Sequence, residues 1–69
     1  MISYAPLWET MKRQGITTYT LRNNGDNNIS ASTMLRLQAG ESVSTNTLDA
    51  LCKILNCTLS DIVEFVPDE

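Results

Sequence analysis

The residues best suited to chemistry lie in the stretch NISASTMLRLQAG, residues 28–40. It begins with small side chains, three of them hydroxylated, at positions 30–33, and it carries a single cation, Arg36. Hydroxyls and free N–H groups at the start of a helix can hydrogen-bond to phosphates or base edges, and a guanidinium can bind guanine or phosphate. The pattern therefore indicates binding rather than catalysis.

The residue types needed for catalysis are scarce. The chain has no histidine, so it lacks both a Ser-His pair and the usual ligands of a metal-bound water. The closest pair of carboxylates in a predicted helix, Asp61 and Glu64, belongs to an acidic terminal segment and is typical of a solvated face. Cys52 and Cys57 are interpreted as small core residues, because a reducing cytoplasm disfavours a disulfide and no four-ligand zinc set exists. We expect neither an enzyme nor a cofactor.

Length and charge limit the architecture and the partners. The 69 residues predict one small domain over 1–69, near the lower limit for a chain that folds alone. No apolar run is long enough to span a bilayer and no signal peptide begins the chain, so we expect a cytoplasmic protein. The net charge is −3, but the last nine residues contain four acids and no cation. The remainder is therefore slightly basic and can turn one face toward phosphate.

Cap signals and hydrophobic spacing predict five helices and no strand, which is an all-α fold. The predicted capping and stop residues are Ser3 and Gly15 for the first helix, Thr17 with an end at Leu21 for the second, Ser30 and Gly40 for the third, Ser44 and Asn56 for the fourth, and Thr58 and Pro67 for the fifth. A polar stretch rich in Asn and Gly, residues 22–28, predicts a loop between the second and third helices.

The apolar positions of these helices predict one core. Its expected members are Leu7, Met11, Leu21, Met34, Leu37, Leu48, Leu51, Leu55 and Ile62, with Trp8 interpreted as a further core residue. If Met34 and Leu37 face the core, then Ser32, Leu35 and Arg36 face outward. A capped helix, a turn, and a second helix with a small polar first turn form a helix-turn-helix, whose second helix enters a major groove about 12 Å wide.

The segment ISASTMLRLQAGESVSTNTLDALCKIL, residues 29–55, resembles the helix-turn-helix of Cro and lambda-repressor-type regulators, the xenobiotic-response-element family. Residues 13–21 resemble the helix that precedes it in that family, and residues 43–65 are similar to the family's closing pair of helices. The resemblance implies a five-helix phage-repressor-like domain with its helix-turn-helix at about 17–39. It also implies a DNA-binding transcriptional regulator, which we expect to be a repressor.

The family's contacts can be transferred to matching positions of this sequence. The resemblance implies a phosphate contact at Thr18, base contacts from the recognition helix, and a second phosphate contact at the start of the fourth helix. Together with the outward-facing residues, the predicted DNA-binding set is Thr17, Thr18, Ser30, Ala31, Ser32, Thr33, Leu35, Arg36, Ser44, Thr45 and Asn46. The partner expected for this set is double-stranded DNA, with no small-molecule effector.

Selective binding needs more than one recognition helix, so a homodimer is expected. Phe65 and Val66, on the outer face of the predicted fifth helix, are its expected interface. Some readings stay open: Arg36 could instead form a surface salt bridge, for example to Glu41, and Ser30 and Thr33 could serve as caps alone. The acidic balance also favours a second class, a protein–protein module on the same fold such as an antitoxin, antirepressor or accessory factor.

Overall fold

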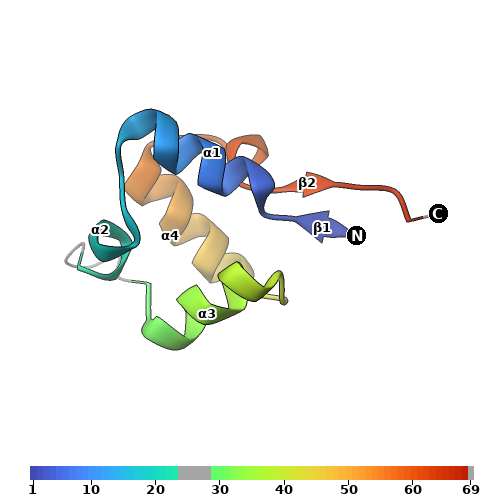
Figure 1. The fold of residues 1–69 in the computed structure, drawn as a ribbon, viewed down its shortest axis with the longest axis horizontal. Coiled ribbons are helices and arrows are strands. Elements are labelled where there is room, and N and C mark those ends of the chain that lie inside the picture. The colour runs from blue at the N-terminus through green and yellow to red at the C-terminus, as the bar shows by residue number, and fades with distance from the viewer. Residues whose placement is uncertain (24–28, 69) are drawn as a thin grey trace.

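The computed structural model of the protein describes residues 1–23 and 29–68. In those ranges the chain forms four α-helices, one 3₁₀ turn and two short strands (Figure 1). In chain order they are β1 (Ile2–Ser3), α1 (Ala5–Gln14), α2 (Thr18–Arg22), α3 (Ala31–Ala39), α4 (Thr45–Leu55), the 3₁₀ turn η2 (Leu59–Asp61) and β2 (Glu64–Phe65). The all-α prediction is therefore correct for the helical body and wrong at the two chain ends, where the strands lie.

The ends of α3 are the predicted ones. Ser30 is the N-cap, and its Oγ accepts a hydrogen bond from the N–H of Thr33 at 3.2 Å. The helix ends at Gly40, whose φ of 75° lies in the left-handed region that glycine adopts without steric cost. The local sequence therefore sets both ends of the helix that carries most of the candidate site.

The same capping chemistry sets the two ends of α4. The Oγ of Ser44 accepts a hydrogen bond from the N–H of Thr47 at 3.3 Å. Asn56 ends the helix in the left-handed region, and the following N–H, that of Cys57, donates to the carbonyl of Cys52 at 3.1 Å. Both predicted ends are confirmed. Asn23 caps the end of α2, and residues 24–28 of the predicted loop lie outside the described part of the chain.

The predicted fifth helix is wrong beyond its first turn. It begins as expected at Thr58, whose N–H donates to Oδ2 of Asp61 at 3.2 Å. After the single turn η2 the chain extends into β2, where Phe65 pairs with Ile2 and Glu64 pairs with Ser3 in an antiparallel ribbon. β-branched and aromatic residues dominate this segment, and they fit a pleated strand better than a helix once a partner strand is present.

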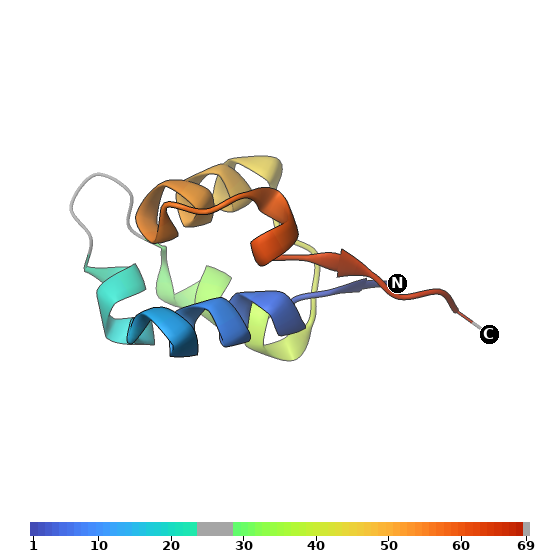
Figure 2. The same ribbon diagram turned by 90° about the horizontal axis from the view of Figure 1, so that it is seen from above.

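The ribbon also displaces the start of α1. Ser3, the predicted N-cap, belongs to β1, and Tyr4 occupies the cap position instead. The Ser3 side chain still serves the helix, because its Oγ accepts a hydrogen bond from the N–H of Ala5 at 3.2 Å. Figure 2 shows the ribbon extending from one end of the helical body, with the N-terminus beside the end of β2. The predicted stop at Gly15 is confirmed.

The core contains eight of the nine predicted residues. The ninth, Leu48, is only partly buried and packs against the core, as does Trp8. The sequence prediction missed two buried apolar residues, Tyr4 and Ile29. The fully buried side chains are Leu7, Leu21, Leu37, Leu51, Leu55 and Ile62. No helix in the described ranges has the length and apolar character needed to cross a membrane.

Hydrogen bonds between distant residues join α1 to the rest of the fold. Thr10 is buried, and its Oγ1 donates to the carbonyl of Asp61 at 2.7 Å. The N–H of Leu7 donates to the carbonyl of Ile62 at 3.1 Å. The hydroxyl of Tyr4 donates to the carbonyl of Glu41 at 2.8 Å, next to the end of α3. α1 therefore supports both the C-terminal turn and the segment that follows α3.

Candidate nucleic-acid interface

The outer face of α3 is formed by small or flexible side chains. Met34 and Leu37 are buried, with 4% and 1% of their surface exposed. Ser32, Leu35 and Arg36 are exposed, and Leu35 exposes 67% of its surface. The structure thus places these three residues on the side of α3 away from the core, as the sequence predicts.

Arg36 does not form the salt bridge with Glu41 that was an alternative reading of the sequence. Among the described residues the ion pairs are Met1 with Asp68 and Lys53 with Asp49. Glu41 meets Arg36 only through the backbone, where its N–H donates to the Arg36 carbonyl at 2.8 Å. The guanidinium of Arg36 therefore projects from α3 without a carboxylate partner in the described part of the chain.

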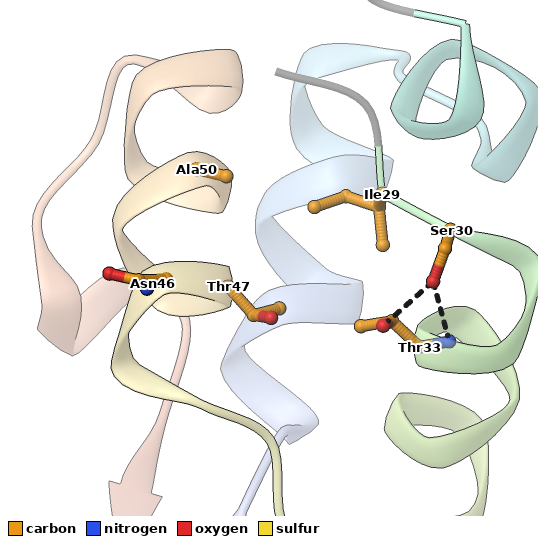
Figure 3. A pocket seen from close by; sticks show the side chains of 6 residues that line it. All are labelled: Ile29, Ser30, Thr33, Asn46, Thr47 and Ala50. Atoms are coloured by element: carbon orange, nitrogen blue, oxygen red, sulfur yellow. Dashed lines mark hydrogen bonds between the residues drawn. The ribbon is translucent and has the colours of Figure 1, made fainter.

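The hydroxyls at the start of α3 form a small network. Ser30 Oγ donates to Oγ1 of Thr33 at 2.9 Å and lies 3.2 Å from Oγ of Ser32 (Figure 3 shows the Ser30–Thr33 bonds). Ser30 and Thr33 therefore act in capping, which is the other reading that the sequence left open. The capping role still leaves both side chains accessible at the helix start, since Ser30 is exposed and Thr33 is partly exposed.

A hollow of about 260 Å³ separates the first turns of α3 and α4. Figure 3 shows Thr33 of α3 and Thr47 of α4 pointing into the space between the two helices. Its lining residues are Ile29, Ser30, Thr33, Asn46, Thr47 and Ala50. The hollow brings Ser30 and Thr33 of the predicted set close to Asn46, while Ser44 and Thr45 lie exposed at the same end of α4. The positive ends of two helix dipoles therefore flank one surface.

A second groove, of about 230 Å³, separates α2 from α3. Thr18 and Arg22 line it from α2, and Ala31, Met34, Leu35 and Gln38 line it from α3. Arg22 and Gln38 were not among the predicted site residues. The spacing of Arg22, four residues after Thr18, places both on one face of α2 and was the available signal. Thr17 occupies the N-cap position of α2 without a side-chain cap bond, and its Oγ1 lies 3.5 Å from Oγ1 of Thr20.

The predicted interface residues lie on the ribbon rather than on a helix. Phe65 belongs to β2 and exposes 69% of its surface, and Val66 follows it. The partner of Phe65 across the ribbon, Ile2, exposes 53% of its surface. Leu59 of η2 is also exposed and borders the same apolar hollow as Ile2 and Phe65. The end of the molecule opposite α2 therefore presents an apolar surface.

The cysteines are free and partly buried, and both pack against the core. Burial raises the pKa of the Cys57 thiol above its ordinary value, and nearby Cys52 and Asp61 raise it further. A raised pKa keeps a thiol neutral and weakly nucleophilic. No cluster of three or more potential metal ligands occurs in residues 1–23 and 29–68.

Two comparisons with known proteins agree with this geometry. A family model described as the Cro/C1-type HTH DNA-binding domain matches residues 6–68. The solved structure of "transcriptional regulator VanUg, Form II" is similar to this chain with a TM-score of 0.86 and 34% sequence identity, over 97% of this chain and 87% of that one. No curated protein sequence matches the chain. On this evidence, the chain belongs to the family of Cro/C1-type helix-turn-helix DNA-binding domains.

Proposed function

We propose that the protein is a cytoplasmic transcriptional repressor that reads a specific DNA sequence by placing α3 in the major groove. The observation that carries the proposal is the outer face of α3, where a small first turn is followed by an exposed Arg36 without a carboxylate partner among the described residues. Membership of a family of DNA-binding domains supports DNA as the ligand of that face.

Small side chains let the first turn of α3 approach the base edges. Ala31 and Ser32 are exposed there, and a larger side chain would hold the helix away from the groove floor. Leu35 offers an apolar contact for a thymine methyl, and Arg36 can donate two hydrogen bonds to O6 and N7 of guanine. Base discrimination is therefore assigned to these four positions.

Phosphate contacts are assigned to the edges of the same surface. Thr17 and Thr18 lie at the start of α2, and Ser44, Thr45 and Asn46 lie at the start of α4. The first N–H groups of a helix lack intrahelical acceptors and favour an anion, especially beside hydroxyl and amide side chains. The hollow between α3 and α4 brings Asn46 close to Ser30, so one phosphate backbone can meet both elements.

The net charge of −3 does not oppose this assignment, because the acids are unevenly placed. Glu64 and Asp68 lie on and beyond the ribbon, which extends away from the helical body (Figure 1). Asp68 is also neutralised in part by the amino group of Met1, 3.3 Å away. Repulsion between these carboxylates and DNA docked on α3 is weakened by distance and by salt.

We further propose that the repressor acts as a homodimer and that Phe65 and Val66 lie in its interface. Two recognition helices, one from each copy, read enough base pairs for selective binding. The exposed apolar side chains of the ribbon support this surface as the contact between copies.

Arg36→Ala tests the function. Duplexes selected from a random DNA pool and a scrambled duplex are titrated with both proteins at two salt concentrations. Loss of a guanine contact costs about 1–3 kcal/mol for each half-site of the selected duplex and relaxes preference at one base pair.

A uniform loss on both duplexes with a smaller salt dependence would instead assign Arg36 to a phosphate. If wild type binds neither duplex, the DNA-binding proposal fails and a protein partner takes the place of DNA. The far-ultraviolet circular dichroism of Arg36→Ala controls for its fold.

A further inference from the structure

Arg22 lies beside the recognition surface on a different helix from Arg36. Thr18 and Arg22 are four residues apart and share the face of α2 that lines the 230 Å³ groove. The opposite wall is formed by Ala31, Leu35 and Gln38, whose spacing of four and three residues marks one stripe of α3. Arg22 is exposed. Its side chain therefore borders the outer face of α3 from the α2 side.

Arg36 lies on the other flank of that face. Successive residues of a helix are rotated by about 100°, so Arg36 is turned about 140° from Ala31 and about 160° from Gln38. Ala31 and Gln38 face α2 across the groove, and Ser32 and Leu35 lie between them and Arg36 around the helix. Arg22 of α2 and Arg36 of α3 thus lie on either side of Ser32 and Leu35, two of the residues assigned to base contacts.

The dimensions of DNA indicate what a cation in the Arg22 position meets. A helix with its side chains is about 10–12 Å wide and fills a major groove about 12 Å wide, so each flank of the helix faces one sugar-phosphate backbone. Arg22 is set back on α2 and is not on the inserted helix, so a backbone phosphate, and not a base edge, is the DNA group it can reach. A guanidinium binds phosphate with two parallel hydrogen bonds.

We propose that Arg22 is a second DNA-contacting cation, which binds a backbone phosphate on the α2 flank of α3. This inference rests on the proposed function. It assigns to Arg22 an affinity role without sequence discrimination, in contrast to the base-reading role of Arg36. The groove between α2 and α3 is then the track along which one DNA strand passes.

The test compares wild type, Arg22→Ala, Arg22→Lys and Lys12→Ala on the selected and scrambled duplexes from 50 to 200 mM salt. Lys12 is the matched control, since it is an exposed cation near the end of α1 and lines neither the groove between α2 and α3 nor the hollow between α3 and α4. Arg22→Ala should reduce the salt slope by about one unit per bound protomer. Counterion release alone predicts affinities lower by about 15-fold at 50 mM and about fourfold at 200 mM, equally on both duplexes.

Arg22→Lys should restore the salt slope, because an ammonium also binds phosphate as a point charge. Lys12→Ala should leave the slope within the error of wild type. If wild type binds DNA but Arg22→Ala has an unchanged salt slope, the Arg22 assignment is wrong and the proposed function stands. A loss confined to the selected duplex would also overturn it, because that result means base reading. If wild type binds no DNA, both proposals fall together.

Discussion

The outer face of α3 and the β1–β2 ribbon are the two exposed surfaces with a defined chemistry, and they differ in kind. The first exposes small polar side chains between two arginines, whereas the second exposes Ile2 and Phe65 as a cross-strand pair. Contacts of the first kind weaken steeply with salt, and contacts of the second kind do not. The difference shows how one short chain can keep the proposed DNA binding and the proposed self-association on separate surfaces with separate energetics.

Both surfaces depend on the same core, so a core cavity should damage both at once. Leu51 of α4 is fully buried, and Leu51→Ala should lower the free energy of unfolding by about 2–5 kcal/mol, a large share of the stability of so small a domain. Urea denaturation followed by circular dichroism measures the loss. Leu35→Ala is the control, because an exposed leucine should cost less than about 0.5 kcal/mol. A loss below about 1 kcal/mol for Leu51→Ala contradicts its place in the core.

Phe65→Glu should abolish self-association and leave the DNA-binding face of α3 intact. A carboxylate in the apolar interface is costly to desolvate, so the variant should sediment as a monomer at micromolar concentration while keeping its helical signal. Its affinity for a duplex with two half-sites should fall by about 100-fold through lost avidity, and its affinity for a single half-site should not change. Phe65→Leu serves as the conservative control and should stay dimeric. Identical sedimentation of wild type and Phe65→Glu would place the interface elsewhere or make wild type a monomer.

A matched pair of caps tests whether the hydroxyls at the start of α3 do more than begin a helix. Ser30 and Ser44 make the same bond to the N–H three residues on, at 3.2 and 3.3 Å. Ser30→Ala and Ser44→Ala should therefore each lower the free energy of unfolding by about 1 kcal/mol in thermal denaturation. At temperatures where both variants are folded, any difference in DNA affinity between them measures direct contact. If both variants lose the same stability and keep wild-type DNA affinity, the two serines act only as helix caps.

The parts of the fold that local chemistry determines were predictable. Local bonds or backbone angles set the ends of α3 and α4, and they involve residues no more than five positions away. Ser30 and Ser44 begin these helices, and Gly40 and Asn56 end them. The ribbon was not predictable in this way. Its strands pair residues 2–3 with residues 64–65, and an apolar run without its partner fits a short helix as well as a strand.

In the candidate site, too, the residues placed by local spacing were predicted and those placed by tertiary packing were not. The exposure of Ser32, Leu35 and Arg36 follows from the helical spacing of two buried neighbours and was predicted. Arg22 shares a face of α2 with the predicted residue Thr18, and this spacing was a signal that the sequence prediction did not use. That this face lies beside α3 depends on how the two helices pack, which the sequence alone does not reveal. Phe65 was assigned to an interface for its apolar character, but its place on a strand depends on β1, at the other end of the chain.

The hydrogen bonds that join the first ten residues to residues 61–66 have a consequence for how the protein is made. Synthesis on the ribosome releases α1 about 50 residues before the groups that Leu7 and Thr10 bond, the carbonyls of Ile62 and Asp61. α1 therefore cannot complete its packing until residues 61 and 62 have left the exit tunnel. Bringing these two distant segments together costs conformational entropy, and this cost slows folding. Folding of this domain therefore requires that residues 61 and 62 have left the ribosome.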